Sequence, residues 1–242
     1  MKNEKGLAMA YFVPEDLITL GVSWYYTWNV YQPNMPPGFV PMSRNGEDPN
    51  LPLDYSGYVL LFNEPNNIEP YGHPITPENG AQIYIGFVEK YPKAKWVVGN
   101  VSVWSWDWLA DFRDNCGNYK LPDAWGIHAY IEMFIDLTTT KMLLNAAHNN
   151  LGGKFWITEF ADTTGNVKND DRLTDYFYNT SWIERWSYFT NRATGSESWY
   201  PKYWNKVQLF DFETNELTAI GEWYAKDKKP YFIWLPFIKK DV

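Results

Sequence analysis

The segment YVLLFNE, residues 58–64, is a nearly continuous apolar run that ends abruptly in polar residues. Strands of a parallel barrel are buried on both faces, so they lack the apolar and polar alternation of a strand with one wet face. Their carboxyl ends meet at one open end of the barrel. We therefore interpret this segment as a barrel strand that carries Asn63 and Glu64 at its carboxyl end.

Seven further β-rich runs extend this pattern along the chain, and most precede a segment that could form a helix. The eight predicted strands cover residues 6–11, 22–28, 39–43, 58–64, 96–102, 125–130, 154–160 and 183–189. Helices are predicted after Pro14, over 105–115 and 134–150, near the end of the tail 209–226, and from an N-cap at Thr76 to about Lys90. The sequence thus predicts an α/β protein, a single (β/α)8 TIM barrel over residues 1–242.

The composition suits a protein that binds flat or ring-shaped ligands. Aromatic residues make up 19% of the 242 residues, with 14 Trp and 18 Tyr, more than packing alone requires. Such rings stack on sugars and on nucleic-acid bases, but the net charge of −8 disfavours binding to a phosphate backbone. We expect a carbohydrate ligand, no nucleic-acid partner and a monomer.

Other classes of function find little support. The single Cys116 and the absence of a Cys/His cluster argue against a disulfide and against a metal site, and no cofactor is expected. No apolar run reaches the roughly 18 residues of a membrane span. The apolar run 231–238 is expected to pack under the barrel floor. Export stays undecided: the protein is extracellular if a signal peptide has been removed and otherwise cytoplasmic.

Two predicted strands, the fourth and the seventh, end in a glutamate. Glu64 follows YVLLFN and Glu159 follows KFWIT. Strands four and seven lie across the mouth of such a barrel, which can bring two carboxyls to the separation of about 5 to 5.5 Å that suits a retaining glycosidase. Each glutamate alone could simply pair with a nearby Arg or Lys. The two together at strand ends favour catalysis, because a carboxylate is costly to bury unless it is used or hydrogen-bonded.

Several of these segments resemble a known family. FNEPN (62–66) and WITEF (156–160) resemble the fourth-strand and seventh-strand motifs of clan A glycoside hydrolases. With SWYYTW (23–28) and FVPM (39–42) in the same order, nearly the whole chain resembles glycoside hydrolase family 128, the endo-β-1,3-glucanases. The resemblance implies that Glu64 is the acid/base, Glu159 the nucleophile and Asn63 a donor to the sugar 2-hydroxyl.

Further residues are expected at the substrate site. His128 and Tyr130 alternate on the sixth strand, as in the His-x-Tyr arrangement of many clan A enzymes. The predicted aromatic and polar binding set is His128, Tyr130, Tyr26, Trp28, Trp104, Trp186 and Tyr188. Ser43, Arg44 and Asn45 stand where the family tends to have Leu-Trp-Gly, so one aromatic platform is expected to be absent. Tyr188 stands where a tryptophan is expected late in strand eight.

Three hypotheses remain open from the sequence. The first is a retaining β-1,3-glucanase. The second is another clan A β-glycanase or glycosidase that acts on xylan, mannan or β-1,4-glucan. The third is a carbohydrate-binding barrel without turnover, against which the matched pair Glu64 and Glu159 argues, because a binding protein has no need of it.

Overall fold

A parallel sheet of eight strands forms the centre of the computed structural model, which describes residues 4–67, 72–132, 134–197 and 207–226. The strands are β1 (Glu4–Ala8), β2 (Trp24–Tyr26), β3 (Met42–Ser43), β4 (Tyr58–Leu61), β5 (Lys95–Ser102), β6 (Ala124–His128), β7 (Phe155–Phe160) and β8 (Ile183–Phe189). Their order in the sheet is β2-β1-β8-β7-β6-β5-β4-β3. The eight predicted strands are therefore confirmed in number and in chain order.

The chain segment before β3 brings the two edges of this sheet together. Phe39 forms a parallel bridge with Tyr25 of β2. Tyr25 donates to the carbonyl of Gly38, and Val40 donates to the carbonyl of Tyr25, each at 2.9 Å. These bonds nearly close the sheet into a barrel, and the prediction of a TIM-barrel architecture is confirmed.

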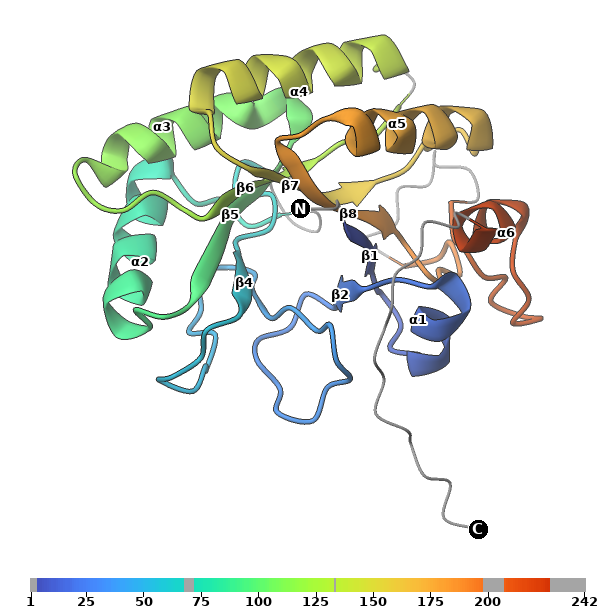
Figure 1. Cartoon of the computed structure of the whole chain (residues 1–242), viewed down its shortest axis with the longest axis horizontal. Helices are drawn as coiled ribbons and strands as arrows, with labels where there is room; N and C mark the ends of the chain where they lie inside the picture. The colour runs from blue at the N-terminus through green and yellow to red at the C-terminus, as the bar shows by residue number, and fades with distance from the viewer. Residues whose placement is uncertain (1–3, 68–71, 133, 198–206, 227–242) are drawn as a thin grey trace.

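Helices lie outside the ring of strands (Figure 1). They are α1 (Pro14–Leu20), α2 (Pro77–Lys90), α3 (Trp106–Cys116), α4 (Leu137–Leu151), α5 (Val167–Asn179) and α6 (Ala219–Lys226), with a 3-10 turn η1 (Val103–Ser105) before α3. The described connections β2–β3 and β3–β4 contain no helix. The barrel therefore has long loops in place of two of its helices.

Local sequence explains where α2 begins. The side chain of Thr76 accepts a hydrogen bond from the backbone N–H of Asn79, and Pro77 occupies the first helical position. Both residues suit a helix start, since the threonine oxygen satisfies an unpaired N–H and the proline has no N–H to leave unpaired. The predicted N-cap is confirmed.

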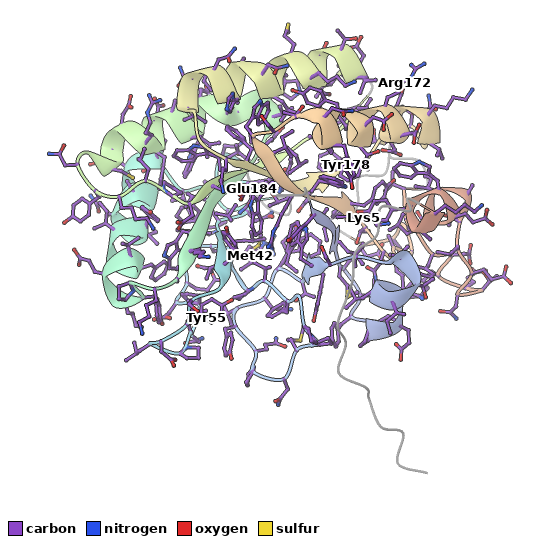
Figure 2. The ribbon with its side chains drawn as sticks, in the orientation of Figure 1. Lys5, Met42, Tyr55, Arg172, Tyr178 and Glu184 are labelled. Atoms are coloured by element: carbon purple, nitrogen blue, oxygen red, sulfur yellow. The ribbon has the colours of Figure 1, made fainter. Side chains whose placement is uncertain are left out.

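The inside of the barrel is filled by side chains, with buried Met42 near the middle of the ring of strands (Figure 2). At the amino end of the strands, the guanidinium of Arg185 lies 4.3 Å from the ring centre of Trp156 and 5.1 Å from that of Tyr58. Trp24 packs against Trp156 from the side. These side chains fill the amino end of the barrel, and Trp24 and Trp156 are fully buried there.

Among the described residues, no helix is long and apolar enough to cross a membrane. The predicted packing of residues 231–238 lies outside the described residues.

Candidate active site

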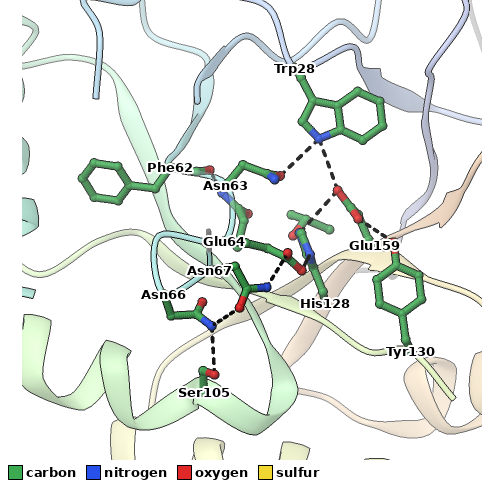
Figure 3. Close-up of polar contacts among 12 residues, drawn as sticks. Trp28, Phe62, Asn63, Glu64, Asn66, Asn67, Ser105, His128, Tyr130 and Glu159 are labelled. Carbon is green, nitrogen blue, oxygen red and sulfur yellow. Dashed lines mark hydrogen bonds and ion pairs between the residues drawn. The ribbon is translucent and has the colours of Figure 1, made fainter. Parts of the chain in front are cut away.

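Two glutamates meet at the carboxyl ends of the strands, on either side of one histidine. His128, the last residue of β6, is buried, and its Nδ1 lies 2.9 Å from Glu64 Oε1. Its Nε2 lies 3.5 Å from Glu159 Oε1, an ion-pair distance. Figure 3 shows the two carboxylates pointing toward this ring, Glu64 from the segment after β4 and Glu159 from β7. One imidazole therefore links the predicted catalytic pair.

The backbone after β4 turns two consecutive side chains toward the site. In a regular strand, neighbouring side chains point to opposite faces. Here Phe62 and Glu64 have positive φ angles of 70° and 46°. The ring of Phe62 packs outward against Trp108 of α3, whereas Asn63 and Glu64 both face the barrel mouth. This departure from strand geometry places an amide and a carboxylate side by side.

Three donors hold the carboxylate of Glu159. Tyr130 donates to Oε2 at 2.5 Å, and the hydroxyl of Tyr26 lies 2.8 Å from Oε1. The indole N–H of Trp28 lies 3.3 Å from the same Oε1. The register of β7 against β8 shifts between Ile157 and Phe160, and such irregularities re-aim side chains beside active sites. Glu159 is thus a buried carboxylate with its orientation fixed from both sides.

Burial and neighbouring charges set the titration of this cluster. Burial raises the pKa of Glu159, and the charge of Glu64 adds to that rise. His128 and the hydrogen bonds from Tyr130 and Tyr26 oppose it without cancelling it. Burial alone would lower the pKa of His128, but Glu159 and Glu64 outweigh it, so that pKa is raised. The pKa values of His128 and Glu159 are therefore both raised, each by burial or by the neighbouring charges of this cluster.

A turn after β4 supports Glu64 from the opposite side. The amide Nδ2 of Asn67 donates to Glu64 Oε2 at 2.7 Å, and the backbone N–H of Asn67 donates to the Glu64 carbonyl at 2.9 Å. The side-chain amide of Asn66 donates to the hydroxyl of Ser105 in η1 at 2.9 Å.

Asn63 is held from the other side of the site. The indole N–H of Trp28 donates to Asn63 Oδ1 at 3.1 Å, which turns the amide NH2 of Asn63 away from Trp28. Both glutamates and Asn63 are therefore held by side chains from several loops (Figure 3).

Seven of the ten residues that the sequence singled out lie in this cluster: Tyr26, Trp28, Asn63, Glu64, His128, Tyr130 and Glu159. The other three lie elsewhere. Trp186 packs against Tyr178 of α5, and Tyr188 packs against Phe160 and α6, so both are buried on the helix side of β8. Trp104 is half exposed in η1, one residue before the Ser105 that contacts Asn66.

Sequence reasoning missed several residues of the cluster. Phe189 faces the site, with its ring 5.9 Å from the rings of Trp28 and Tyr130. Counting by twos from Arg185, which lies inside the barrel, would have selected Phe189 rather than Tyr188. Asn67 was also missed, although Pro65 after Glu64 is a turn signal that brings a residue three positions on back toward the glutamate.

Glu132 adds a third carboxyl, close enough to Glu64 for their charges to interact. Ile131 pairs with Asp162, which extends the pairing of β6 and β7 beyond the two strands. Burial raises the pKa of Glu132, and the charge of Glu64 raises it further. Among the described residues, no group of three or more His, Cys, Asp and Glu side chains could hold a metal ion.

The arrangement can perform acid/base and nucleophilic chemistry on a bond placed between the two glutamates. Glu159 carries one buried carboxylate held by donors, and Glu64 carries a second that faces the histidine and Asn67. A pair of carboxyl groups in different environments is the requirement for glycoside hydrolysis.

Comparisons with known proteins agree with this geometry. The model of the family described as glycosyl hydrolase catalytic core matches residues 14–224. A search of curated proteins found no match.

Solved structures share the fold over nearly the whole chain. An endo-β-1,3-glucanase of glycoside hydrolase family 128, subgroup IV, from Lentinula edodes is 18% identical, with a TM-score of 0.73, covering 91% of this chain and 98% of that one. A subgroup I endo-β-1,3-glucanase mutant from Amycolatopsis mediterranei, in complex with laminaripentaose, is 19% identical, with a TM-score of 0.70 and coverage of 93% and 99%. A subgroup VII oligosaccharide-binding protein from Trichoderma gamsii is 17% identical, with a TM-score of 0.66 and coverage of 92% of each chain. At these identities the likeness establishes the fold alone.

Proposed function

The chain belongs to the glycosyl hydrolase catalytic core family, and from that premise we propose that it is a retaining glycoside hydrolase that cleaves β-1,3-glucan. The observation that carries the proposal is the placement of Glu64 and Glu159 at the two nitrogens of His128. Glu159 is the nucleophile and Glu64 the acid/base in this proposal.

The reaction proceeds in two displacements. In the first, a carboxylate oxygen of Glu159 attacks the anomeric carbon, the glycosidic C–O bond breaks, and Glu64 gives its proton to the leaving oxygen. In the second, Glu64 takes a proton from a water molecule, whose oxygen attacks the same carbon and releases Glu159. Two inversions return the sugar to its original configuration.

Neighbouring side chains suit these roles. Tyr130 and Tyr26 donate to Glu159, which favours the ionised form that a nucleophile requires. Asn63 is held by Trp28, and its NH2 group is proposed to donate to the sugar 2-hydroxyl. That bond strengthens as positive charge develops on the sugar ring, so it lowers the barrier selectively.

The substrate assignment rests on the structural neighbours. Those from Lentinula edodes and Amycolatopsis mediterranei are described as endo-β-1,3-glucanases, and the second holds laminaripentaose. The rival is a carbohydrate-binding barrel without turnover, since the neighbour from Trichoderma gamsii is described as an oligosaccharide-binding protein. Another β-glycan as substrate is the second alternative.

Reducing-sugar release from laminarin, curdlan, barley mixed-linkage glucan, xylan, mannan and carboxymethylcellulose tests the proposal. The wild type is compared with Glu159→Ala and with Glu184→Ala, a glutamate that pairs with Lys154 far from the cluster. We expect release from laminarin or curdlan that Glu159→Ala lacks and Glu184→Ala retains. The first-formed product, observed by NMR, should be the β-anomer.

Each other outcome has a defined meaning. Activity confined to another polymer would keep the mechanism and replace the substrate. Binding without hydrolysis of any polymer would favour the binding barrel. An α-anomer as the first product would contradict the retaining mechanism.

A further inference from the structure

Asn100 lies beneath the segment that carries the proposed acid/base. It belongs to β5 and is fully buried. Its side-chain Nδ2 donates to the carbonyl of Phe62 at 2.8 Å and to that of Leu61 at 3.2 Å. Its own carbonyl accepts the backbone N–H of Glu64 at 3.0 Å. One residue therefore binds the chain on both sides of the turn that ends in Glu64.

The far side of the Asn100 amide is fixed by close packing. A Cβ added at Gly126 of β6 would lie 2.1 Å from Asn100 Oδ1, so the amide occupies the space that a side chain at Gly126 would need. Asn100 Oδ1 is buried and has no hydrogen-bond partner among the described residues. A buried acceptor without a partner is destabilising, and an apolar side chain would fill the space without that cost.

The backbone of Asn100 is also unusual. Its φ angle is 48°, in the left-handed region, and the register between β5 and β6 shifts between Gly99 and Val101. Unfavourable backbone conformations persist only where the surroundings enforce them, and they cluster at functional sites. Asn100 thus combines a strained backbone, an unpaired acceptor and two hydrogen bonds to one short segment.

We propose that Asn100 is a positioning residue for Glu64. Its hydrogen bonds hold the carbonyls of Leu61 and Phe62, and with them the positive φ angles that turn the Glu64 carboxyl toward the leaving-group oxygen. The inference rests on the proposed function, because it assumes that Glu64 is the acid/base. Asn100 contacts neither substrate nor Glu159 in this proposal, and Asn63 keeps its own hydrogen bond from Trp28. Removal of the Asn100 side chain should therefore impair proton transfer by Glu64 and leave nucleophilic attack nearly intact.

This division of labour gives a kinetic signature. Loss of the acid matters only when the leaving group needs a proton. A dinitrophenyl group leaves without one, whereas a phenyl group requires it. A displaced Glu64 should therefore lower kcat/KM on phenyl β-laminaritrioside and spare kcat/KM on the dinitrophenyl compound. A merely structural defect would lower both by the same factor.

The test variant is Asn100→Gly, because glycine keeps the positive φ angle without strain while removing the side-chain donor. We expect kcat/KM on the phenyl substrate to fall about 10- to 100-fold, the effect of a displacement of about 1 Å in a catalytic group. On the dinitrophenyl substrate kcat/KM should change by less than about threefold, since no proton transfer is needed. Azide should speed turnover of the dinitrophenyl substrate, because its attack on the glycosyl-enzyme needs no base.

A second variant perturbs the same contact from the opposite side. Gly126→Ala pushes on the Asn100 amide without changing residue 100, and it should produce the same leaving-group dependence. It carries the test if Asn100→Gly does not fold. The matched control is Asn191→Ala: Asn191 is equally buried but donates to the carbonyl of Tyr11, at the seam between β1 and β8. Any loss in this control should be equal on both substrates.

Glu64→Ala separates the failure of the inference from the failure of the proposed function. If Glu64→Ala shows the leaving-group dependence and the Asn100 and Gly126 variants lose both activities equally or neither, the positioning role is overturned. If Glu64→Ala itself shows no such dependence, the acid/base assignment falls, and the inference falls with it.

Discussion

Replacing Tyr130 with phenylalanine tests how the site keeps Glu159, the proposed nucleophile, ionised. The pKa of Glu159 is raised, first by burial and then by Glu64, and the hydrogen bond from Tyr130 opposes that rise. Glu159 must be ionised to attack, so activity is lost as the pH falls through its pKa. Tyr130→Phe removes a donor that opposes the rise, so the pKa of Glu159 rises further. The low-pH side of the pH–activity profile, its acid limb, then moves to higher pH.

The magnitude follows from the bond that is lost. Tyr130 donates to Glu159 Oε2 at 2.5 Å in a buried site, and a hydrogen bond to a charged group contributes about 1.5 to 3 kcal/mol. On the acid limb, Tyr130→Phe should therefore lower kcat/KM by about 10- to 150-fold, at 1.36 kcal/mol per factor of ten. At pH values above the acid limb, Glu159 is ionised in both proteins, so the ratio of the wild-type kcat/KM to the variant kcat/KM should be smaller.

The assay is kcat/KM on a dinitrophenyl β-laminaritrioside across the pH range, because this substrate isolates the nucleophilic step from proton donation. Tyr26→Phe is the matched control: its hydroxyl lies 2.8 Å from Glu159 and is shared with the carbonyl of Thr158 at 3.0 Å. It should shift the acid limb in the same direction by less. Circular dichroism at each pH shows that the variants stay folded. If the ratio of the wild-type kcat/KM to the Tyr130→Phe kcat/KM is the same at every pH, the reasoning is refuted.

Two further perturbations address the frame around the site. Trp28→Phe keeps an aromatic ring but removes the N–H that lies near both Asn63 and Glu159. The value of kcat/KM on laminarin should fall about 5- to 100-fold, as expected for about 1 to 3 kcal/mol of hydrogen bonding. Unchanged kinetics would contradict a role for the indole N–H. Arg192→Met leaves buried Asp16 without the guanidinium that binds both of its oxygens at 2.9 Å. Thermal unfolding should show a Tm lower by about 6 to 20 °C, the equivalent of about 3 to 5 kcal/mol. An unchanged Tm would show that the pair does not stabilise the barrel.

The strands were predictable because a strand that is buried on both faces has a short, nearly continuous apolar sequence. Residues 58–61 (YVLL) and 155–157 (FWI) are short apolar runs followed within a few residues by polar ones, and in an α/β protein this pattern is typical of a buried parallel strand. The start of α2 was predictable for a local reason, since Thr76 and Pro77 satisfy the helix terminus by themselves. Features that depend only on neighbouring residues can therefore be predicted from the sequence alone.

The helix α5 was not predicted, because one buried position on it is a carboxyl. Its inward face consists of Asp170, Leu173, Thr174 and Phe177, which have helical spacing but are only half apolar. Asp170 accepts the backbone N–H of Asp162 at 2.7 Å, and burial raises the pKa of Asp170 to about 8. A tertiary contact therefore replaces an apolar residue. The helix VKNDDRLTDYFYN is mostly polar, so its few apolar residues are easily overlooked although they have helical spacing.

The error on β8 has a different origin. Tyr188 was expected at the site, whereas Phe189 is the residue that faces Trp28. A shift of one residue moves a side chain from the inside of a barrel to its helix side. A count by twos along β8 gives Phe189 only when one inward residue, here Arg185, is already known, and the structure identifies that residue by its contact with Trp156.

The proposed catalytic centre forms where the strand geometry is irregular. Six non-glycine residues have positive φ angles in the described part of the chain, and four of them belong to the site or support it: Trp28, Phe62, Glu64 and Asn100. A regular strand could present Asn63 or Glu64 to the barrel mouth, but not both, because adjacent side chains alternate. Strained conformations of about 1 to 3 kcal/mol each are the alternative, and the apolar barrel core supplies the stability that offsets them. The motif FNE thus predicts which residues form the proposed site, whereas the arrangement that turns adjacent residues to one side is hydrogen-bonded to Asn100, thirty-six positions beyond Glu64 along the chain.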